Sequence, residues 1–143
     1  MQKIKILFLC TGNSCRSQMA ESLCKCIKRD SIQAYSAGVK PVKVNPLAIE
    51  VMKEKNIDIS GYRSKSIEEF KSSNFDYIIT LCDSAKETCP YFPGKIIHHG
   101  FGDPPAIAKK CKTKEEKLRV YKKIRDEIEE FVQTLPYSLL KEK

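Results

Sequence analysis

The segment "FLCTGNSCRSQMAE" (residues 8–21) joins a run of apolar residues to a run with helical periodicity. The apolar run that ends in this segment, "KIKILFLC", alternates at first and then becomes continuously apolar, which is typical of a buried parallel strand. Beyond the loop, Met19, Leu23 and Ile27 recur at four-residue intervals and predict a helix over residues 17–29. The segment therefore predicts a strand, a loop and a helix in succession, the first unit of an α/β fold.

Three further segments are predicted to be strands. They are "QAYSAG", which ends at Gly38, "DYIITLC", which ends at Cys82, and "KIIHHG", which ends at Gly100. Strands that alternate with helices indicate an α/β three-layer sandwich with a central four-stranded parallel sheet and helices on both faces. A chain of 143 residues is large enough for one hydrophobic core, so we expect residues 1–143 to form a single domain.

The helix starts carry recognisable signals. Asn45, followed by a proline, is a typical N-cap for the helix "PLAIEVMKEK". Ser66–Glu69 forms a capping box that opens a short helix. Thr113 and Glu116 form a second capping box at the start of a long helix, which Pro136 ends.

Composition and charge restrict the class of protein. Seven cysteines in a chain whose first residues do not resemble a signal peptide predict a cytoplasmic protein with reduced thiols. No apolar run is long enough to span a bilayer. Residues 109–125 carry nine Lys and Arg against two Glu, but only one aromatic residue interrupts them. We therefore interpret this segment as a solvated helix face and expect no nucleic-acid or membrane partner.

Candidate site residues follow the predicted strands. Cys10 ends the first strand, Cys82 ends the third, and Asp103 follows the fourth. In parallel α/β folds the functional site lies beyond the carboxyl ends of the strands, so these three side chains are predicted to converge.

The loop after the first strand has the composition of an oxyanion cradle. Gly12 and Asn13 tolerate the dihedral angles with which successive N–H groups point at one centre, where the dipole of the following helix adds to the positive field. Arg16 can hold two oxyanion oxygens at once. The predicted oxyanion-binding residues are Thr11, Gly12, Asn13, Ser14, Cys15, Arg16 and Ser17.

This field favours the thiolate form of Cys10, which we predict to be the nucleophile. Asp103, in "GFGDPP", is a candidate general acid toward a leaving oxygen. The alternatives are an ordinary strand-end cysteine and a zinc site. The chain has no paired Cys-x-x-Cys motif, and His98 and His99 are adjacent rather than spaced as ligands, so we expect no metal site.

These residues resemble the family that includes low-molecular-weight protein tyrosine phosphatases and thioredoxin-coupled arsenate reductases. The resemblance extends from "ILFLCTGNSCRSQMAE" through "YSAG", "IDIS" and "ITLC" to "FGDP" and "RDEI". It implies the low-molecular-weight phosphatase fold and a catalytic Cys10, Arg16 and Asp103. The loop alone does not separate the two branches, because both have it.

Two downstream cysteines favour the arsenate reductase branch. Cys82 and Cys89 resemble its relay cysteines, and reduction of arsenate needs two electrons, which thiols supply by forming a disulfide. The resemblance implies a transient Cys10–Cys82 disulfide, then a Cys82–Cys89 disulfide that thioredoxin reduces as the external reductant, with no bound cofactor. Asp103 is followed by two prolines, whereas the tyrosine phosphatases usually place an aromatic residue after Asp-Pro.

Some arsenate reductases of this type hold potassium beneath the loop. Asn13, Glu21 and Ser36 match the residue types used there, but Lys65 stands where a carboxylate is expected. An ammonium group would replace or repel the cation, so we expect no potassium activation.

Two other functions remain open. The first is a phosphatase for phosphotyrosine or small aryl phosphates, which would work through a Cys10 phosphoenzyme without Cys82 and Cys89. The second is a non-catalytic oxyanion or redox sensor, whose disulfide would change a partner surface. The complete set of nucleophile, cradle and acid favours an enzyme.

Overall fold

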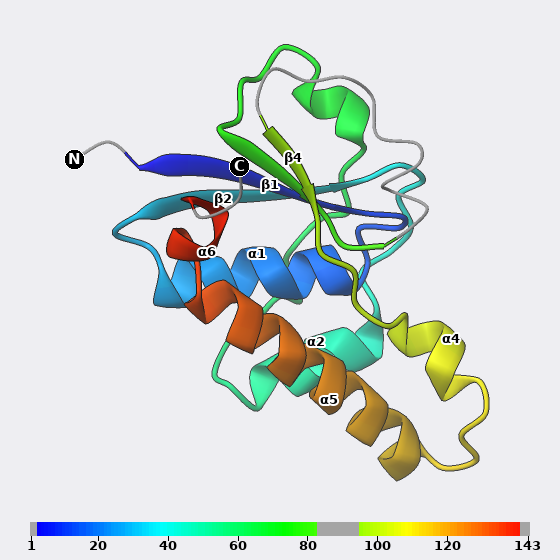
Figure 1. Cartoon of the computed structure of the whole chain (residues 1–143). Helices are drawn as coiled ribbons and strands as arrows, with labels where there is room; N and C mark the ends of the chain where they lie inside the picture. The colour runs from blue at the N-terminus through cyan, green and yellow to red at the C-terminus, as the bar shows by residue number, and fades with distance from the viewer. Residues whose placement is uncertain (1–2, 83–94, 141–143) are drawn as a thin grey trace.

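The computed structural model describes residues 3–82 and 95–140. The elements alternate between strands and helices, as the sequence predicts, and Figure 1 shows their arrangement. In chain order they are β1 (Ile4–Cys10), α1 (Arg16–Ile27), β2 (Ile32–Gly38), α2 (Pro46–Lys53), the 3-10 helix η1 (Ile67–Phe70), β3 (Tyr77–Thr80), β4 (Lys95–His98), α4 (Pro104–Ala108), α5 (Lys114–Gln133) and α6 (Tyr137–Leu140).

The four strands form one parallel sheet in the order β2-β1-β3-β4. The apolar β1 lies between two neighbours, which explains why its second half has no polar face. Its last residue, Cys10, pairs in register with Gly38 of β2, and Leu9 pairs with Thr80 of β3. The predicted four-stranded parallel sheet is thereby confirmed, and the carboxyl ends of β1, β2 and β3 meet at one edge.

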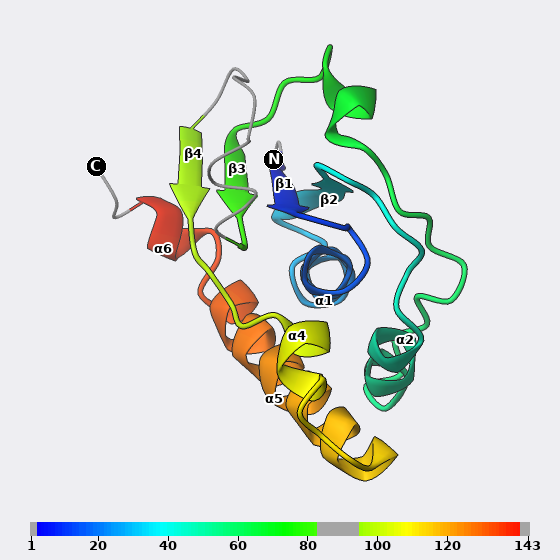
Figure 2. The same ribbon diagram turned by 90° about the vertical axis from the view of Figure 1, so that its right-hand side faces the viewer.

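Helices cover both faces of this sheet. On one face α1 packs against β2 and α5 packs against α1, and Figure 2 shows both helices below the strands. On the other face Tyr35 of β2 makes edge-to-face contacts with Phe70 at the end of η1 and with Phe75. The three-layer arrangement is therefore confirmed. Helices α1 and α5 cover one face of the sheet, and η1 lies on the opposite face.

The predicted caps are present, and some element ends differ from the prediction. Ser66 and Thr113 each form both bonds of a capping box, and the Asn45 side chain accepts from the first amides of α2. Ile27 was expected on the apolar face of α1 but is 40% exposed, because the helix ends at this residue. Within residues 3–82 and 95–140, no helix combines the length and the apolar character needed to cross a bilayer.

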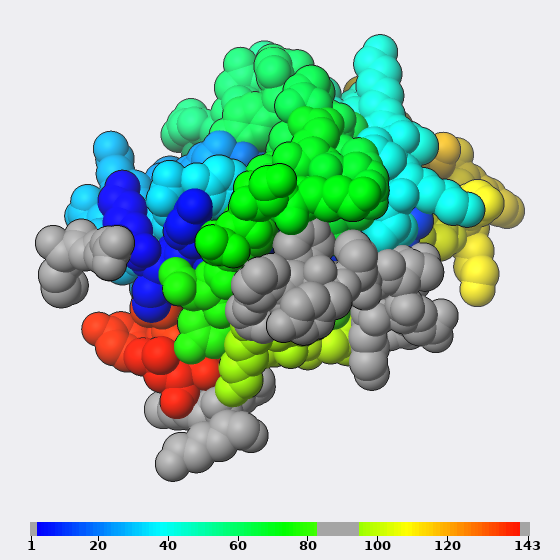
Figure 3. All heavy atoms as spheres, turned by 90° about the horizontal axis from the view of Figure 1, so that it is seen from above, coloured from blue at the N-terminus to red at the C-terminus, as the bar shows by residue number. Residues whose placement is uncertain are grey.

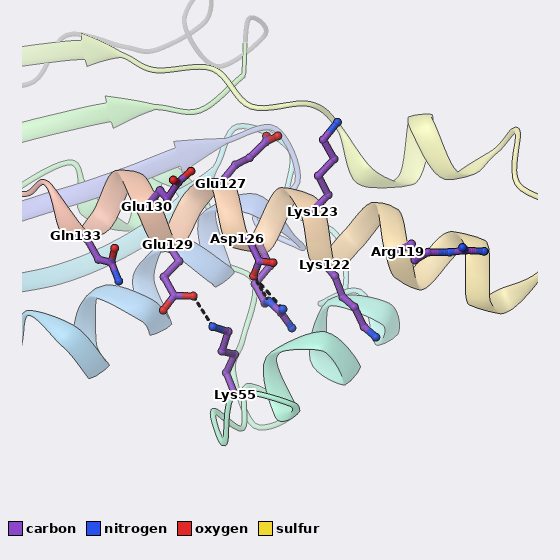
Figure 4. A pocket seen from close by; sticks show the side chains of 10 residues that line it. Lys55, Arg119, Lys122, Lys123, Asp126, Glu127, Glu129, Glu130 and Gln133 are labelled. Carbon is purple, nitrogen blue, oxygen red and sulfur yellow. Dashed lines mark hydrogen bonds and ion pairs between the residues drawn. The ribbon is translucent and has the colours of Figure 1, made fainter.

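The basic segment lies mainly on α5, where acidic partners neutralise part of its charge. Lys122 and Arg125 both contact Glu54 at 3.1 Å, and Lys114 lies 3.4 Å from Glu50. Figure 4 shows that Lys122 and Lys123 leave α5 on different sides, along a charged groove of about 950 Å³. These contacts support the interpretation as a solvated helix face.

Candidate active site

The predicted site lies in the loop between β1 and α1. A pocket of about 320 Å³ opens over this loop. Four elements contribute to its wall, namely the end of β1, the loop, the segment after β2 and the start of α4. The lining residues are Cys10, Thr11, Gly12, Ser14, Cys15, Arg16, Lys40, Val42, Asp103 and Pro105. Asn13 and Ser17 lie beneath the pocket, fully buried.

Asn13 fixes the shape of the loop from below. Its backbone has a φ of 49°, a left-handed conformation that asparagine tolerates better than most residues. Its side-chain amide donates to Ser17 Oγ at 2.7 Å, while its Oδ1 accepts from the Lys65 backbone N–H at 2.7 Å. Gln18 also donates to Oδ1, at 3.0 Å. Because each of these bonds is buried or partly buried, they hold the loop in one conformation.

The segment that follows β2 supports the loop from the side. The amides of Lys40, Val42 and Asn45 donate to loop carbonyls of Thr11, Gly12 and Ser14, at 2.9, 2.9 and 2.8 Å. This segment can come so close because residue 38 is a glycine. A Cβ on Gly38 would lie 2.7 Å from the Thr11 carbonyl oxygen and 2.8 Å from the Asn13 nitrogen.

Cys10 is buried at the base of the pocket. Its Sγ lies 2.8 Å from Ser17 Oγ. Since the Asn13 amide donates to that same hydroxyl oxygen, the Ser17 proton is free to point at the sulfur. Ser17 can therefore donate a hydrogen bond to the Cys10 sulfur and hold it in place for attack as a nucleophile.

Arg16 and Asp103 face each other across the pocket. Arg16 Nη1 donates to the Phe101 carbonyl oxygen at 3.0 Å, and Nη2 lies 3.8 Å from Asp103 Oδ1. The Arg16 side chain is 10% exposed and that of Asp103 is 49% exposed. The guanidinium is thus oriented before any anion binds, and the carboxyl group remains accessible to a leaving oxygen.

Cys82 lies at the same edge of the sheet. It is buried, and its Sγ lies 3.1 Å from Thr11 Oγ1 in the loop. The structure thus places Cys10, Arg16 and Asp103 in the wall of one pocket, and it places Cys82 against Thr11 of the loop rather than in the pocket wall. Cys89 lies outside the described residues.

The remaining thiols differ in reactivity. Burial, with the nearby Cys10 as a smaller cause, raises the pKa of the Cys15 thiol far above its ordinary value. Burial also raises the pKa of Cys24 to about 12. Cys26 is exposed. Cys15 and Cys24 are therefore neutral thiols at physiological pH, whereas Cys26 is accessible.

The structure also identifies residues that the sequence did not. Lys40, Val42 and Pro105 line the pocket, and Figure 3 shows the cyan segment after β2 and the yellow region of α4 at the same end of the molecule. Tyr121 of α5 accepts a hydrogen bond from the Asn45 side chain at 3.1 Å. Of these residues, Lys40 has a signal in the sequence. It follows the end of a strand beside β1 by two residues, and the functional site is expected at that edge of the sheet.

The residues beneath the loop do not fit a potassium ion. Lys65 Nζ lies 3.6 Å from Glu21 Oε1 and 3.5 Å from Ser36 Oγ. It also donates to the Arg63 carbonyl oxygen at 3.1 Å. The oxygens that would have to surround a cation therefore already surround an ammonium group. In the part of the chain that the structure describes, no group of three His, Cys, Asp or Glu side chains is arranged to hold a metal ion.

Known proteins resemble this chain in sequence and in fold over most of its length. An arsenate reductase of Halalkalibacterium halodurans is 45% identical over 136 residues, which cover 94% of this chain and 96% of that protein. A solved structure described as an arsenate reductase in the phosphate binding state superposes with a TM-score of 0.79 at 32% identity, covering 94% of this chain and 98% of the other.

A thioredoxin-dependent arsenate reductase of Corynebacterium glutamicum is more distant. It is 25% identical with a TM-score of 0.70, and the match covers 98% of this chain and 63% of that one. A family model, low molecular weight phosphotyrosine protein phosphatase, matches residues 5–143. The loop, the sheet and the match over nearly the whole chain lead to one conclusion: the protein belongs to the low molecular weight phosphotyrosine protein phosphatase family.

Proposed function

We propose that this protein reduces arsenate to arsenite, for arsenic detoxification, with a relay of three cysteines that thioredoxin regenerates. The relatives named arsenate reductase support the reaction, and the thioredoxin-dependent relative supports the reductant. The observation that carries the proposal is the contact of Cys82 with Thr11, because a second sulfur lies beside the loop that holds the nucleophile. Hydrolysis of a phosphate ester needs no second sulfur.

The first step is attack of the Cys10 thiolate on arsenic(V). A sulfur–arsenic bond forms, and a hydroxyl group of arsenate leaves as water once Asp103 has supplied a proton. Arg16 and the amides of residues 11–17 hold the remaining oxygens, and Ser17 holds the sulfur before it reacts.

The second step transfers two electrons to arsenic. The Cys82 thiolate attacks the Cys10 sulfur, and a Cys10–Cys82 disulfide forms. The sulfur–arsenic bond breaks, and its electron pair stays on arsenic, which leaves as arsenic(III) in arsenite. Cys89 then attacks Cys82, so that Cys10 departs as a thiolate and a Cys82–Cys89 disulfide remains. The dithiol of thioredoxin reduces this disulfide and becomes oxidised itself.

The test is NADPH consumption in a mixture of the purified protein, thioredoxin and thioredoxin reductase, with and without arsenate. We expect arsenate-dependent oxidation that Cys10→Ser, Cys82→Ser and Cys89→Ser each abolish. Cys26→Ser is the matched control, because Cys26 is an exposed thiol away from the pocket, and it should keep full activity. Normal turnover of Cys89→Ser would contradict the relay.

A second function follows from the family itself. A phosphatase would use the same Cys10 to form a phosphoenzyme, and Asp103 would protonate the oxygen of an ester such as phosphotyrosine or a small aryl phosphate. Hydrolysis of an aryl phosphate that survives Cys82→Ser, without any arsenate-dependent NADPH oxidation, would favour this function.

The same proposal includes the organisation and location of the protein. We place residues 1–143 in one domain, which the family match over residues 5–143 supports. We place the protein in the cytoplasm, because a thiol relay needs a compartment that keeps cysteines reduced. The proposal includes no bound cofactor.

A further inference from the structure

Beneath the oxyanion loop, Lys65 makes two backbone hydrogen bonds and one ion pair with three different parts of the fold. The Lys65 backbone N–H donates to Asn13 Oδ1 at 2.7 Å, and its carbonyl oxygen accepts from Gly38 N–H at 2.8 Å. Its side chain reaches below the loop to the Glu21 carboxylate. Lys65 thus contacts the loop, the end of β2 and helix α1.

The Lys65 ammonium lies in a site of oxygen atoms. Glu21 Oε1, Ser36 Oγ and the Arg63 carbonyl oxygen lie 3.6, 3.5 and 3.1 Å from Nζ. The side chain of Lys65 is 17% exposed and that of Glu21 is 6% exposed. A carboxylate, a hydroxyl and a carbonyl are donors for a hard cation, and here a lysine supplies the positive charge.

Glu21 needs this charge because it is buried. Ser36 Oγ donates to one carboxylate oxygen, and Lys25 Nζ lies 2.5 Å from the other. Lys25 is half exposed, so Lys65 is the more buried of the two ammonium groups that face Glu21. Burial lowers the pKa of Lys65 below its ordinary value, and the Glu21 carboxylate opposes this shift.

We propose that the Lys65 ammonium is a built-in cation that stabilises the anion-binding conformation of the loop and makes the site independent of potassium. The charge balances Glu21, and the backbone of the same residue holds Asn13 at the positive φ that shapes the loop. Lys65 is therefore a positioning residue: it acts on the bound anion through Asn13 and does not touch the anion itself.

The experiment measures two equilibrium properties of the full reduced chain, the unfolding temperature and the dissociation constant of inorganic phosphate. Each is measured in potassium, sodium and choline chloride at equal ionic strength. Neither property depends on arsenate reduction, so failure here is distinguishable from failure of the proposed function. The variants are Lys65→Asp, Lys65→Met and the control Lys71→Met, which removes an exposed lysine that pairs with Glu68 in η1.

We expect the wild type and Lys71→Met to behave identically in the three salts. Lys65→Met should bind phosphate at least fivefold more weakly in all three, because Glu21 loses its buried partner. Lys65→Asp should place a second carboxylate beside Glu21, and a bound cation would then be needed to balance the two negative charges. Its unfolding temperature should be lowest in choline and rise by several degrees in potassium, and its phosphate affinity should rise with it.

Two results would overturn the proposal. One is a saturable gain in stability or phosphate affinity when potassium is added to the wild type. The other is wild-type phosphate affinity in Lys65→Met. If Lys65→Asp does not fold, these two measurements still decide the question.

Discussion

The Thr11 hydroxyl lies 3.1 Å from the Cys82 sulfur. Thr11 is the first residue of the oxyanion loop, and Cys82 is 71 positions further along the chain, so this contact connects the anion cradle to the second thiol. A hydroxyl in this position can donate to a thiolate and stabilise it before it attacks.

Replacement of Thr11 by valine removes this donor and keeps the shape of the side chain. Loss of a hydrogen bond to a charged group costs about 1.5–3 kcal/mol, so we expect thioredoxin-coupled turnover to fall by about tenfold or more. Phosphate affinity should change by less than about threefold, since the loss concerns the second sulfur. Thr11→Ser keeps the hydroxyl and should recover most of the turnover; equal defects in both variants would contradict this role.

Gly38→Ala tests the close approach of β2 to the loop. The added Cβ would lie within 2.9 Å of three backbone atoms of residues 11–13, which cannot rotate away. We expect a loss of about 2–3 kcal/mol in the free energy of unfolding, measured with urea, together with weaker phosphate binding. Gly61→Ala is the control because a Cβ there meets nothing within 4 Å. A stable Gly38→Ala variant would mean that the loop can shift at little cost.

Lys40 lines the pocket, and its backbone bond to Thr11 fixes where its side chain begins. An ammonium group at the mouth of an anion site attracts the anion through partly screened charge, an effect of about 0.5–1 kcal/mol. Lys40→Gln should therefore weaken phosphate binding by about two- to fivefold at low salt and less at high salt. Lys43→Gln is the control, because Lys43 carries the same charge but does not line the pocket. An equal loss of phosphate affinity in Lys43→Gln would show that only the net charge of the protein matters.

Burial of neutral thiols predicts a loss of stability in alkali. The pKa of Cys24 is raised to about 12 in the folded protein. A group with a raised folded-state pKa contributes stability that is complete below its unfolded pKa, and this contribution is lost as pH rises toward the folded value. Cys24 alone should cost about 2 kcal/mol between about pH 8 and about pH 10.

Urea unfolding at the two pH values measures this loss. In Cys24→Ala the decrease in unfolding free energy between them should be smaller than in the wild type by about that amount, whatever the absolute stability of the variant. Cys26→Ala should leave the decrease unchanged, because Cys26 is exposed. Parallel pH profiles for Cys24→Ala and the wild type would contradict the assignment.

Local patterns predicted the parts of the fold that depend on neighbours in sequence. The capping boxes at Ser66 and Thr113 and the N-cap at Asn45 are formed as expected, because each needs only residues within three positions. The position of Cys82 beside Thr11, the residue after Cys10, followed from the rule that parallel strands place their carboxyl ends together.

What the sequence could not predict depends on contacts between distant segments. The contact of Asn13 with the Lys65 backbone spans 52 positions, and the Asn45–Tyr121 bond spans 76. Neither has a local pattern, because packing of the layers decides which side chains meet. The exposure of Ile27 has a different cause, since periodicity marks a face of a helix and does not say where the helix ends.

Asn45 connects the first turn of helix α2 to the oxyanion loop, so the stability of that turn depends on whether an anion occupies the loop. Its Oδ1 caps α2 through the Leu47 and Ala48 amides, its N–H donates to Ser14, and its side-chain amide donates to Tyr121. Asn45 is therefore hydrogen-bonded to the start of α2, to Ser14 of the oxyanion loop and to Tyr121 of α5. Hydrogen exchange of the Leu47 amide consequently works as a reporter: protection of this single proton, outside the pocket, should rise when an anion occupies the loop.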